Sequence, residues 1–216
     1  MNHFVELSLA TVAALLPIIN PFSTAALFLG LTEGDLPSWR RQQAKMGVIY
    51  MVAILVVFLL AGTLIMNFFG ISLPGVRIAG GILVGRVAIG MLYPRDEEGS
   101  EAAHKENRKR KDVSFFPLAM PSLAGPGAIA VTITLATLAD SWSHYLAIII
   151  GILVMGVITY LTLLASGAIT RVLGVTGMQA LTKIMGFLIF CIAVQFIVNG
   201  VLDPSLLARL KEGLGL

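Results

Sequence analysis

The sequence has little charge. Only 12% of its 216 residues are Asp, Glu, Lys or Arg, whereas 57% are hydrophobic and the mean hydropathy is +0.90. A soluble domain of this size could not cover so much apolar surface with so few charged groups. These values exclude soluble enzymes and soluble binding modules, and they predict a protein that crosses a membrane several times.

Cysteine is nearly absent too, which excludes disulfides and CxxC motifs. The single Cys191 lies in an apolar run, so we expect it to be a small buried hydrophobic residue. The three histidines have no partner at metal-ligand spacing, and neither a Ser/His/Asp set nor an HExxH motif occurs. We therefore expect no enzymatic activity, no metal and no cofactor.

Basic residues outnumber acidic ones by three, but they gather in the segments that connect apolar runs. The positive-inside rule explains this placement without a nucleic-acid partner. The N-terminal stretch "MNHFVELSLATVAALL" has no Lys or Arg and so lacks the basic start of a cleaved signal peptide. We expect it to begin the first membrane span.

The apolar runs are long and unbroken, as in "YMVAILVVFLLAGTLIM", which favours helices over the alternating pattern of barrel strands. The turn signals between the runs divide the chain into six expected spans. These are residues 5–31, 47–69, 74–93, 115–138, 144–166 and 180–201.

Loop charges predict the orientation of these spans. The connections at 32–46, 94–113 and 167–179 carry Lys or Arg, whereas those at 70–73 and 139–143 carry none. This bias places the first group in the cytoplasm and both termini in the periplasm.

The two halves of the chain resemble each other. "PIINPFSTAALFLGL" in the first half is similar to "PSLAGPGAIAVTITL" in the second, and Pro21 and Pro126 lie 105 residues apart. A unit of three spans is an odd number, so its second copy is inserted upside down. We predict an all-α membrane protein of two inverted three-helix repeats, at 1–93 and 114–202, joined by a charged linker at 94–113 and followed by a tail at 203–216.

Both repeats break their first helix. Proline lacks an N–H and interrupts the helical hydrogen bonds, so Pro21 and Pro126 each predict a second half-helix that begins inside the membrane. Asn20 is suited to cap the first of these half-helices, and Gly125 occupies the same position in the second. Gly127 would let a ligand approach the backbone closely. Matched broken helices in inverted repeats are typical of secondary transporters.

The half-helix ends predict a site for a small zwitterion. Their free N–H groups suit a carboxylate, and the freed carbonyls together with Asn20 and Ser23 suit an ammonium group. We expect the substrate to contact Asn20, Pro21, Ser23, Thr24, Ser122, Gly125, Pro126 and Gly127.

Three further polar residues have two readings each. Arg86 near the middle of the third span either binds a substrate carboxylate or extends its charge toward the cytoplasm. Gln195 and Asn199 lie one turn apart in the sixth span, where hydrogen bonding between helices is the simpler explanation. They are retained as possible secondary site residues.

Four stretches, "LLPIINPFSTAALFLGL", "FGISLPGVRIAGG", "FPLAMPSLAGPGAIA" and "MGFLIFCIAVQFIVNG", resemble the MarC family of integral membrane proteins. The resemblance covers nearly the whole chain except the linker and the tail. It implies six spans in a bacterial inner membrane. Archaeal relatives are small neutral amino acid transporters for glycine and alanine, which implies a similar role here. Asn20, Pro21, Gly125, Pro126 and Gly127 match the two family motifs.

We therefore expect alternating-access transport of a small neutral amino acid across the inner membrane. Transport of another small solute or drug, or a non-transport role in membrane assembly or regulation, remains the alternative. No carboxylate lies deep in a predicted span, so coupling to H⁺ or Na⁺ stays open. The expected partners are the zwitterionic substrate and the lipid bilayer, not nucleic acid; the oligomeric state is left open.

Overall fold

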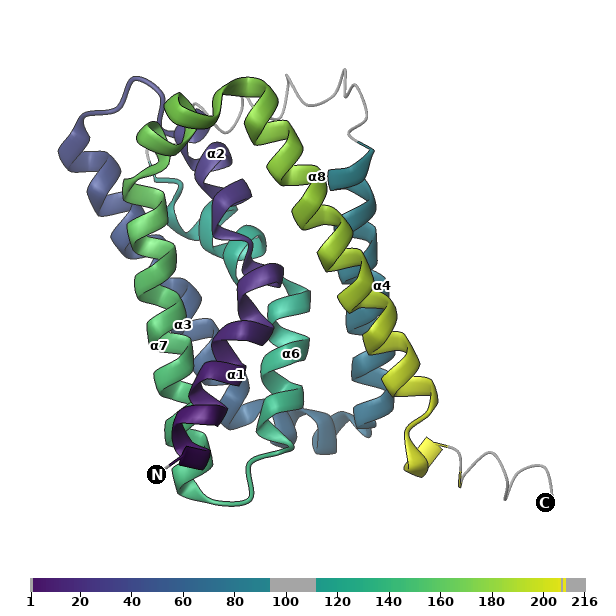
Figure 1. Cartoon of the computed structure of the whole chain (residues 1–216). Helices are drawn as coiled ribbons and strands as arrows, with labels where there is room; N and C mark the ends of the chain where they lie inside the picture. The colour runs from purple at the N-terminus through teal and green to yellow at the C-terminus, as the bar shows by residue number, and fades with distance from the viewer. Residues whose placement is uncertain (1, 94–111, 207, 209–216) are drawn as a thin grey trace.

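The computed structural model describes residues 2–93, 112–206 and 208, and every secondary-structure element in these residues is helical. Figure 1 shows the elements as one upright bundle. They are α1 (Asn2–Ile19), α2 (Pro21–Leu31), α3 (Pro37–Phe69), α4 (Leu73–Leu92), η1 (Ser114–Leu123), α6 (Pro126–Ala136), α7 (Trp142–Leu164) and α8 (Ser166–Val201).

The helices confirm an all-α membrane protein. In the described residues, four of them are long and apolar enough to cross a membrane. The short elements form two further pairs, α1 with α2 and η1 with α6, which are bent by 46° and 60°. Residues 2–93 and 112–206 thus contain four candidate spans, or up to six if each bent pair crosses the membrane as one span.

Two expected loops are helical instead. The segment 32–46 was predicted as a loop, but α3 already begins at Pro37, where proline at the first helical position is favourable. The segment 167–179 was also predicted as a loop, yet it belongs to α8, which changes direction at Gly174 with a φ of 63°. Charged and polar residues hid the first of these helices, and the glycines of "GVTGM" suggested a turn within the second. The predicted linker lies outside the described residues except for its last two.

Those two residues attach the second half of the chain to the first. Val113 donates its N–H to the Oε1 atom of Gln43 on α3 over 3.0 Å, and Gln43 is buried. Asp112 accepts hydrogen bonds from the hydroxyl and the N–H of Ser114, and these bonds lower the pKa of the Asp112 carboxyl. The start of η1 is therefore fixed against α3.

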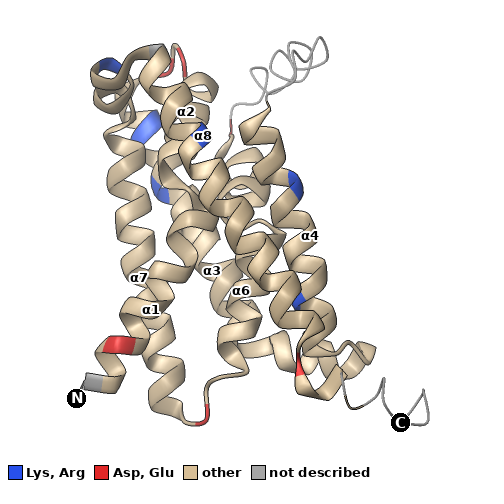
Figure 2. Ribbon diagram, turned by 45° about the vertical axis from the view of Figure 1, so that its right-hand side comes forward, with Lys and Arg blue, Asp and Glu red and all other residues tan. Residues whose placement is uncertain are grey.

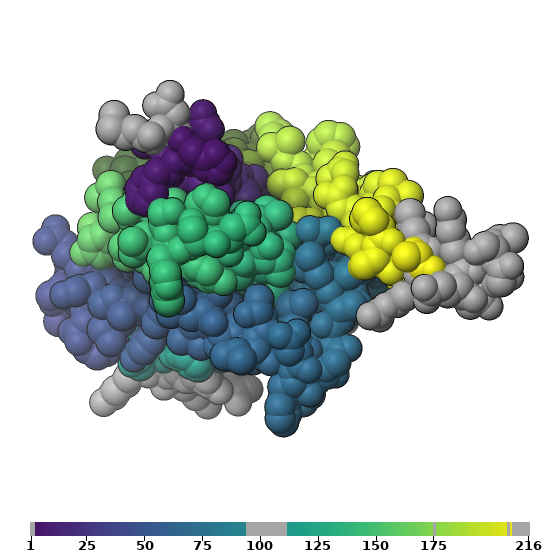
Figure 3. Space-filling view, turned by 90° about the horizontal axis from the view of Figure 1, so that it is seen from below, coloured from purple at the N-terminus to yellow at the C-terminus, as the bar shows by residue number. Residues whose placement is uncertain are grey.

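The chain runs up and down the bundle (Figure 1). The α2–α3 and α7–α8 connections lie at one end, and the start of α1 and the end of α8 lie at the other. Most of the basic segments lie in the half nearer the first end (Figure 2). Seen from below, the α6–α7 connection lies beside the start of α1, whereas the end of α8 lies at the edge of the bundle (Figure 3).

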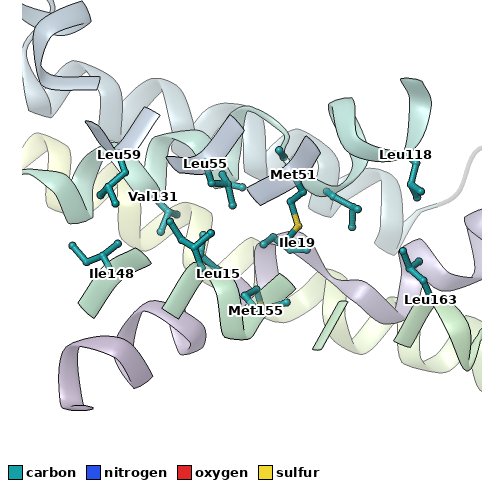
Figure 4. Packing of buried hydrophobic residues seen from close by; sticks show 14 of the residues in the cluster. Leu15, Ile19, Met51, Leu55, Leu59, Leu118, Val131, Ile148, Met155 and Leu163 are labelled. Carbon is teal, nitrogen blue, oxygen red and sulfur yellow. The ribbon is translucent and has the colours of Figure 1, made fainter. Parts of the chain in front are cut away.

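The broken pairs occupy the centre of the bundle, between α3 and α7. Side chains from α1, α3, α6 and α7 interlock there (Figure 4). Burying them stabilises the bundle by close packing, since lipid is as apolar as the side chains themselves. The cluster includes Leu15, Ile19, Met51, Leu55, Leu59, Leu118, Val131, Ile148, Met155 and Leu163.

Helices α4 and α8 pack along each other as a second unit. Their shared cluster contains Val84, Ala88, Ile189 and Ala193. Gly81 permits the close approach, since a Cβ there would lie 2.7 Å from the carbonyl oxygen of Ala193. Gly81 and Gly85 form a G-x-x-x-G pattern that serves helix packing here.

We predict that Gly151→Ala destabilises the bundle. A Cβ at Gly151 would lie 2.8 Å from the carbonyl oxygen of Ser8 and 2.6 Å from the Cβ of Thr11, so α1 and α7 would have to separate. Overpacking of this kind costs about 1–3 kcal/mol. Gly30→Ala is the control, because no atom lies within 4 Å of its Cβ position. Thermal unfolding of both variants in detergent tests this; equal melting temperatures would contradict it.

Candidate functional site

The first break is a single left-handed residue between two helices. Asn20 ends α1 with a φ of 44°, and Pro21 begins α2. The Oδ1 atom of Asn20 accepts from the N–H of Ser23 over 3.4 Å, and its Nδ2 group donates to the Ser23 hydroxyl over 2.9 Å. The predicted capping role of Asn20 is confirmed.

The polar groups of this break are largely satisfied from within. Thr24 donates its hydroxyl to the carbonyl oxygen of Ile19 over 3.3 Å, bridging the helix ends across the proline. Asn20 is only 5% exposed, and its Nδ2 group also lies 3.9 Å from the Sδ atom of Met91 on α4. A ligand at Asn20 would have to displace this thioether.

The second break is longer and less regular. Its first half is not the α-helix that the span at 115–138 predicted, because Phe116 and Met120 within η1 have extended backbones that interrupt the helix. Pro117 and Pro121 lack the N–H that an α-helix needs. Hydrogen bonds between residues five apart in sequence are formed here instead. Ala124 donates to the carbonyl oxygen of Ala119, and the Ser122 hydroxyl donates to that of Pro117 over 2.8 Å.

Gly125 and Gly127 are required by close contacts. A Cβ at Gly125 would lie 2.5 Å from the carbonyl oxygen of Pro121. A Cβ at Gly127 would overlap Val84 on α4 and lie 3.2 Å from Ile18 on α1. The Cβ position of Gly127 is thus filled by neighbouring helices, while Gly127 also lines the cavity beside α6.

Helix α6 begins without a side-chain cap. Gly125 precedes it, and Pro126 occupies its first position. The N–H groups of Gly127 and Ala128 have no acceptor within the helix, as at any helix start. The two breaks therefore differ: the Asn20 side chain satisfies the first, and the second leaves its N–H groups available.

A cavity of about 360 Å³ adjoins this uncapped start. It brings together four of the predicted site residues at the second break with Arg86, but it does not include Asn20, Ser23 or Thr24. Ile18 connects it to the first break, two residues before Asn20. Its walls are Ile18, Leu83, Val84, Arg86, Val87, Pro121, Ser122, Gly125, Pro126, Gly127, Ala128 and Ile189.

The other polar candidates lie apart from the breaks. Gln195 donates to Asn199 over 2.7 Å within α8, and both side chains are exposed, so the expected bond between helices is not formed in this structure. Arg86 is exposed at the rim of the cavity. Cys191 is exposed as well, which corrects its expected burial. It lies on the outward side of α8, where an apolar neighbourhood in sequence faces the surroundings rather than the core.

Sequence reasoning missed the apolar part of the site. Ile18, Val84 and Met91 contact or enclose the breaks, but nothing in their sequence context separates them from other apolar residues of the spans. Only the spatial arrangement of α1 and α4 identifies them.

A family model for MarC family integral membrane proteins matches residues 5–204, which include both breaks. The chain belongs to this family. Within the MarC family, it is 42% identical to the inner membrane protein MarC of Citrobacter koseri, over 94% of this chain and 97% of the relative. The MarC protein of Salmonella typhimurium shows the same identity and coverage. That of Escherichia coli O1:K1 is 42% identical over 88% of this chain and 91% of its own length.

No solved structure matches this MarC family chain. The names of the relatives support a multi-pass inner membrane protein, in agreement with the apolar helices.

We predict an order of stability for variants at Asn20. Asn20→Ala loses the cap and also the side-chain hydrogen bonding by which asparagine tolerates a left-handed backbone, and these losses together cost about 2 kcal/mol or more. Asn20→Gly loses the cap but fits the backbone, and should cost only a few tenths of a kcal/mol. The melting temperature should fall by about 4–8 °C for alanine and far less for glycine. If both variants lost the same stability, the left-handed φ of 44° at residue 20 would not decide which residues the break tolerates.

Proposed function

We propose that the chain is a secondary transporter that moves a small neutral amino acid of the glycine or alanine type across the inner membrane by alternating access. The observation that carries the proposal is the presence of two bent helix pairs, with Asn20-Pro21 at one break and Gly125-Pro126 at the other, side by side in the bundle. Irregular backbone at membrane depth is tolerated where it is buried in protein or lines a wet cavity, and transporters place their substrate at such breaks.

The packing of the helices supports two related halves. Helix α3 of the first half contacts η1 and α6, and α7 of the second half contacts α1 and α2. In the same way, α4 contacts α6 and α8 contacts α2. Exchanging the two halves leaves this set of contacts unchanged, as expected for inverted repeats. The bent pairs also run in opposite directions (Figure 1).

The cavity at the second break suits a small ligand. Its volume of about 360 Å³ is at the lower end for ligand pockets. The uncapped start of α6 favours a carboxylate, and the Arg86 guanidinium at the rim adds positive charge on the same side. Ser122, whose hydroxyl already donates to Pro117, can accept from a substrate ammonium group.

Transport of a different solute is the second candidate. Most of the cavity wall is aliphatic, so a small apolar molecule could also enter it. A solute without a carboxylate would make no use of the start of α6 or of Arg86. The chemistry of the wall thus favours the zwitterion over a neutral drug and over a purely structural role, for which free N–H groups beside a cavity have no purpose.

We predict uptake of labelled alanine and glycine by liposomes that contain the purified protein. Asn20→Ala should reduce the initial rate of uptake by about tenfold or more. Without the Asn20 side chain the residues around the first break would shift, and a small shift in a binding site is enough to slow turnover. Asn67→Ala is the matched control, because Asn67 is exposed near the end of α3, far from the breaks in sequence. Imposed pH and sodium gradients then identify the coupling ion.

Loss of uptake is informative only if the variant proteins are folded. Both variants must elute as single species with wild-type helical content before their rates are compared. A rate unaffected by Asn20→Ala in folded protein would remove the first break from the site. Absence of uptake for every small amino acid, with folded protein, would favour the alternative solute or the non-transport role.

We also predict that both ends of the chain are periplasmic. The start of α1 and the end of α8 lie at the same end of the bundle, opposite the α2–α3 and α7–α8 connections. Cysteines introduced at Asn2 and Ser205 in a Cys191→Ser background should react with an impermeant reagent in intact spheroplasts. A cysteine at Trp39 should react only in inverted vesicles; the reverse pattern would invert the orientation.

A further inference from the structure

A second cavity lies between α2, α4 and α8, and the site described above does not use it. Its volume is about 680 Å³. Thr170 at its edge lies close to the α7–α8 connection, at the end of the bundle where most basic segments gather (Figure 2). The walls are Ala26, Gly90, Met91, Thr170, Met178, Gln179, Thr182 and Lys183.

Most of the cavity wall is apolar, but its side on α8 carries polar residues and is exposed. Gln179 and Lys183 on α8 are exposed, and Thr170 and Thr182 are half-buried. The exposed Gln179 amide and Lys183 ammonium need polar partners, so water is favoured over lipid at this side of the cavity. An aqueous cavity at the cytoplasmic end is what a solute leaving or entering the cell would need.

Met91 lies between this cavity and the first break. Its side chain lines the cavity, and its Sδ atom lies 3.9 Å from the Nδ2 group of Asn20. Asn20 itself lines neither cavity and is 5% exposed. The thioether is therefore the group that separates the capping amide from this cavity.

The backbone holds Met91 in this place and leaves its side chain free to move. A Cβ at Gly186 on α8 would lie 2.9 Å from the Cβ of Met91, so only glycine allows α8 to come so close. Methionine has three flexible side-chain bonds and no branches, which lets it change rotamer without moving the helix. A weak sulfur contact to an amide is also easily exchanged for a ligand contact.

We propose that the cavity between α2, α4 and α8 is an aqueous vestibule through which a small zwitterion reaches the first break, and that Met91 is the gating residue that closes Asn20 from it. This inference rests on the proposed function for the identity of the solute, but not for the existence of the gate. Because movement of the single Met91 side chain creates the opening, only a small solute can pass.

The test measures access to Asn20 without any solute. In a Cys191→Ser background, which removes the exposed native thiol, single cysteines are introduced at Asn20 and at Gln179. A membrane-impermeant methanethiosulfonate reagent is added to inverted membrane vesicles, and the modification rates are measured. We expect rapid modification of Gln179→Cys and slow modification of Asn20→Cys.

Substitution of the gate should change only the second rate. Met91→Ala should raise modification of Asn20→Cys by about tenfold or more, because the rate follows the fraction of molecules in which the site is open. Met178→Ala is the matched control, since Met178 lines the same cavity but is not the residue in contact with Asn20; it should leave the rate within about twofold. Thr24→Cys, with a residue 6% exposed beside the same break, replaces Asn20→Cys as the probe if the latter does not fold.

Each result has a definite meaning. An unreactive Gln179→Cys would overturn the vestibule. A buried probe that reacts as fast as Gln179→Cys with Met91 in place, or one that Met91→Ala leaves protected, would overturn the gate. If this accessibility pattern appears but no amino acid is taken up by liposomes, the vestibule and gate stand and only the proposed solute fails.

Discussion

The structure depends on the satisfaction of backbone polar groups where helices break inside an apolar bundle. An unpaired N–H or carbonyl exposed to lipid costs several kcal/mol, so a break persists only where protein or water supplies the partner. At the first break the partner is the Asn20 side chain, with Ser23 and Thr24 completing the set. At the second break the carbonyl oxygens accept hydrogen bonds from N–H groups five residues later and from the Ser122 hydroxyl. The start of α6 has no side-chain cap.

The two breaks therefore differ in whether a cavity reaches them. The first break is covered and buried, with the Met91 thioether between its amide and a cavity of about 680 Å³. The second is open to a cavity of about 360 Å³ with a guanidinium at its rim. Two related breaks with one closed and one open are what alternating access would produce in a single conformation. The proposed transport cycle would exchange these states by moving one half against the other.

Much of this arrangement could be predicted from the sequence. Pro21 and Pro126 identify both breaks, because a proline interrupts the helix at its own position. Asn20 identifies the cap, because a capping side chain binds N–H groups only two or three residues away. The four helices long and apolar enough to cross a membrane followed from long apolar runs, whose cause is the thickness of the bilayer. The all-helical membrane class and the family resemblance were confirmed by the structure and by the family match.

The rest depends on contacts between distant helices. Gly127 lines the cavity, but Val84 of α4 fills its Cβ position, and no local pattern reveals which helix will be the neighbour. The helical part of 32–46 was missed because its polarity resembles that of a loop, and that of 167–179 because its glycines suggested a turn. Cys191 was misplaced because an apolar helix side can face lipid as well as the core. Met91 and Ile18 carry no chemical signal at all and become visible only through their distances to the breaks.

The most direct test of the account is equilibrium binding of labelled alanine to the purified protein, with competition by glycine and by ethylamine, which lacks the carboxylate. The account predicts saturable binding that glycine displaces and ethylamine does not, because the start of α6 and the positive rim of its cavity recognise the carboxylate. Binding that ethylamine displaces as well as glycine does, or no saturable binding by folded protein, would contradict it.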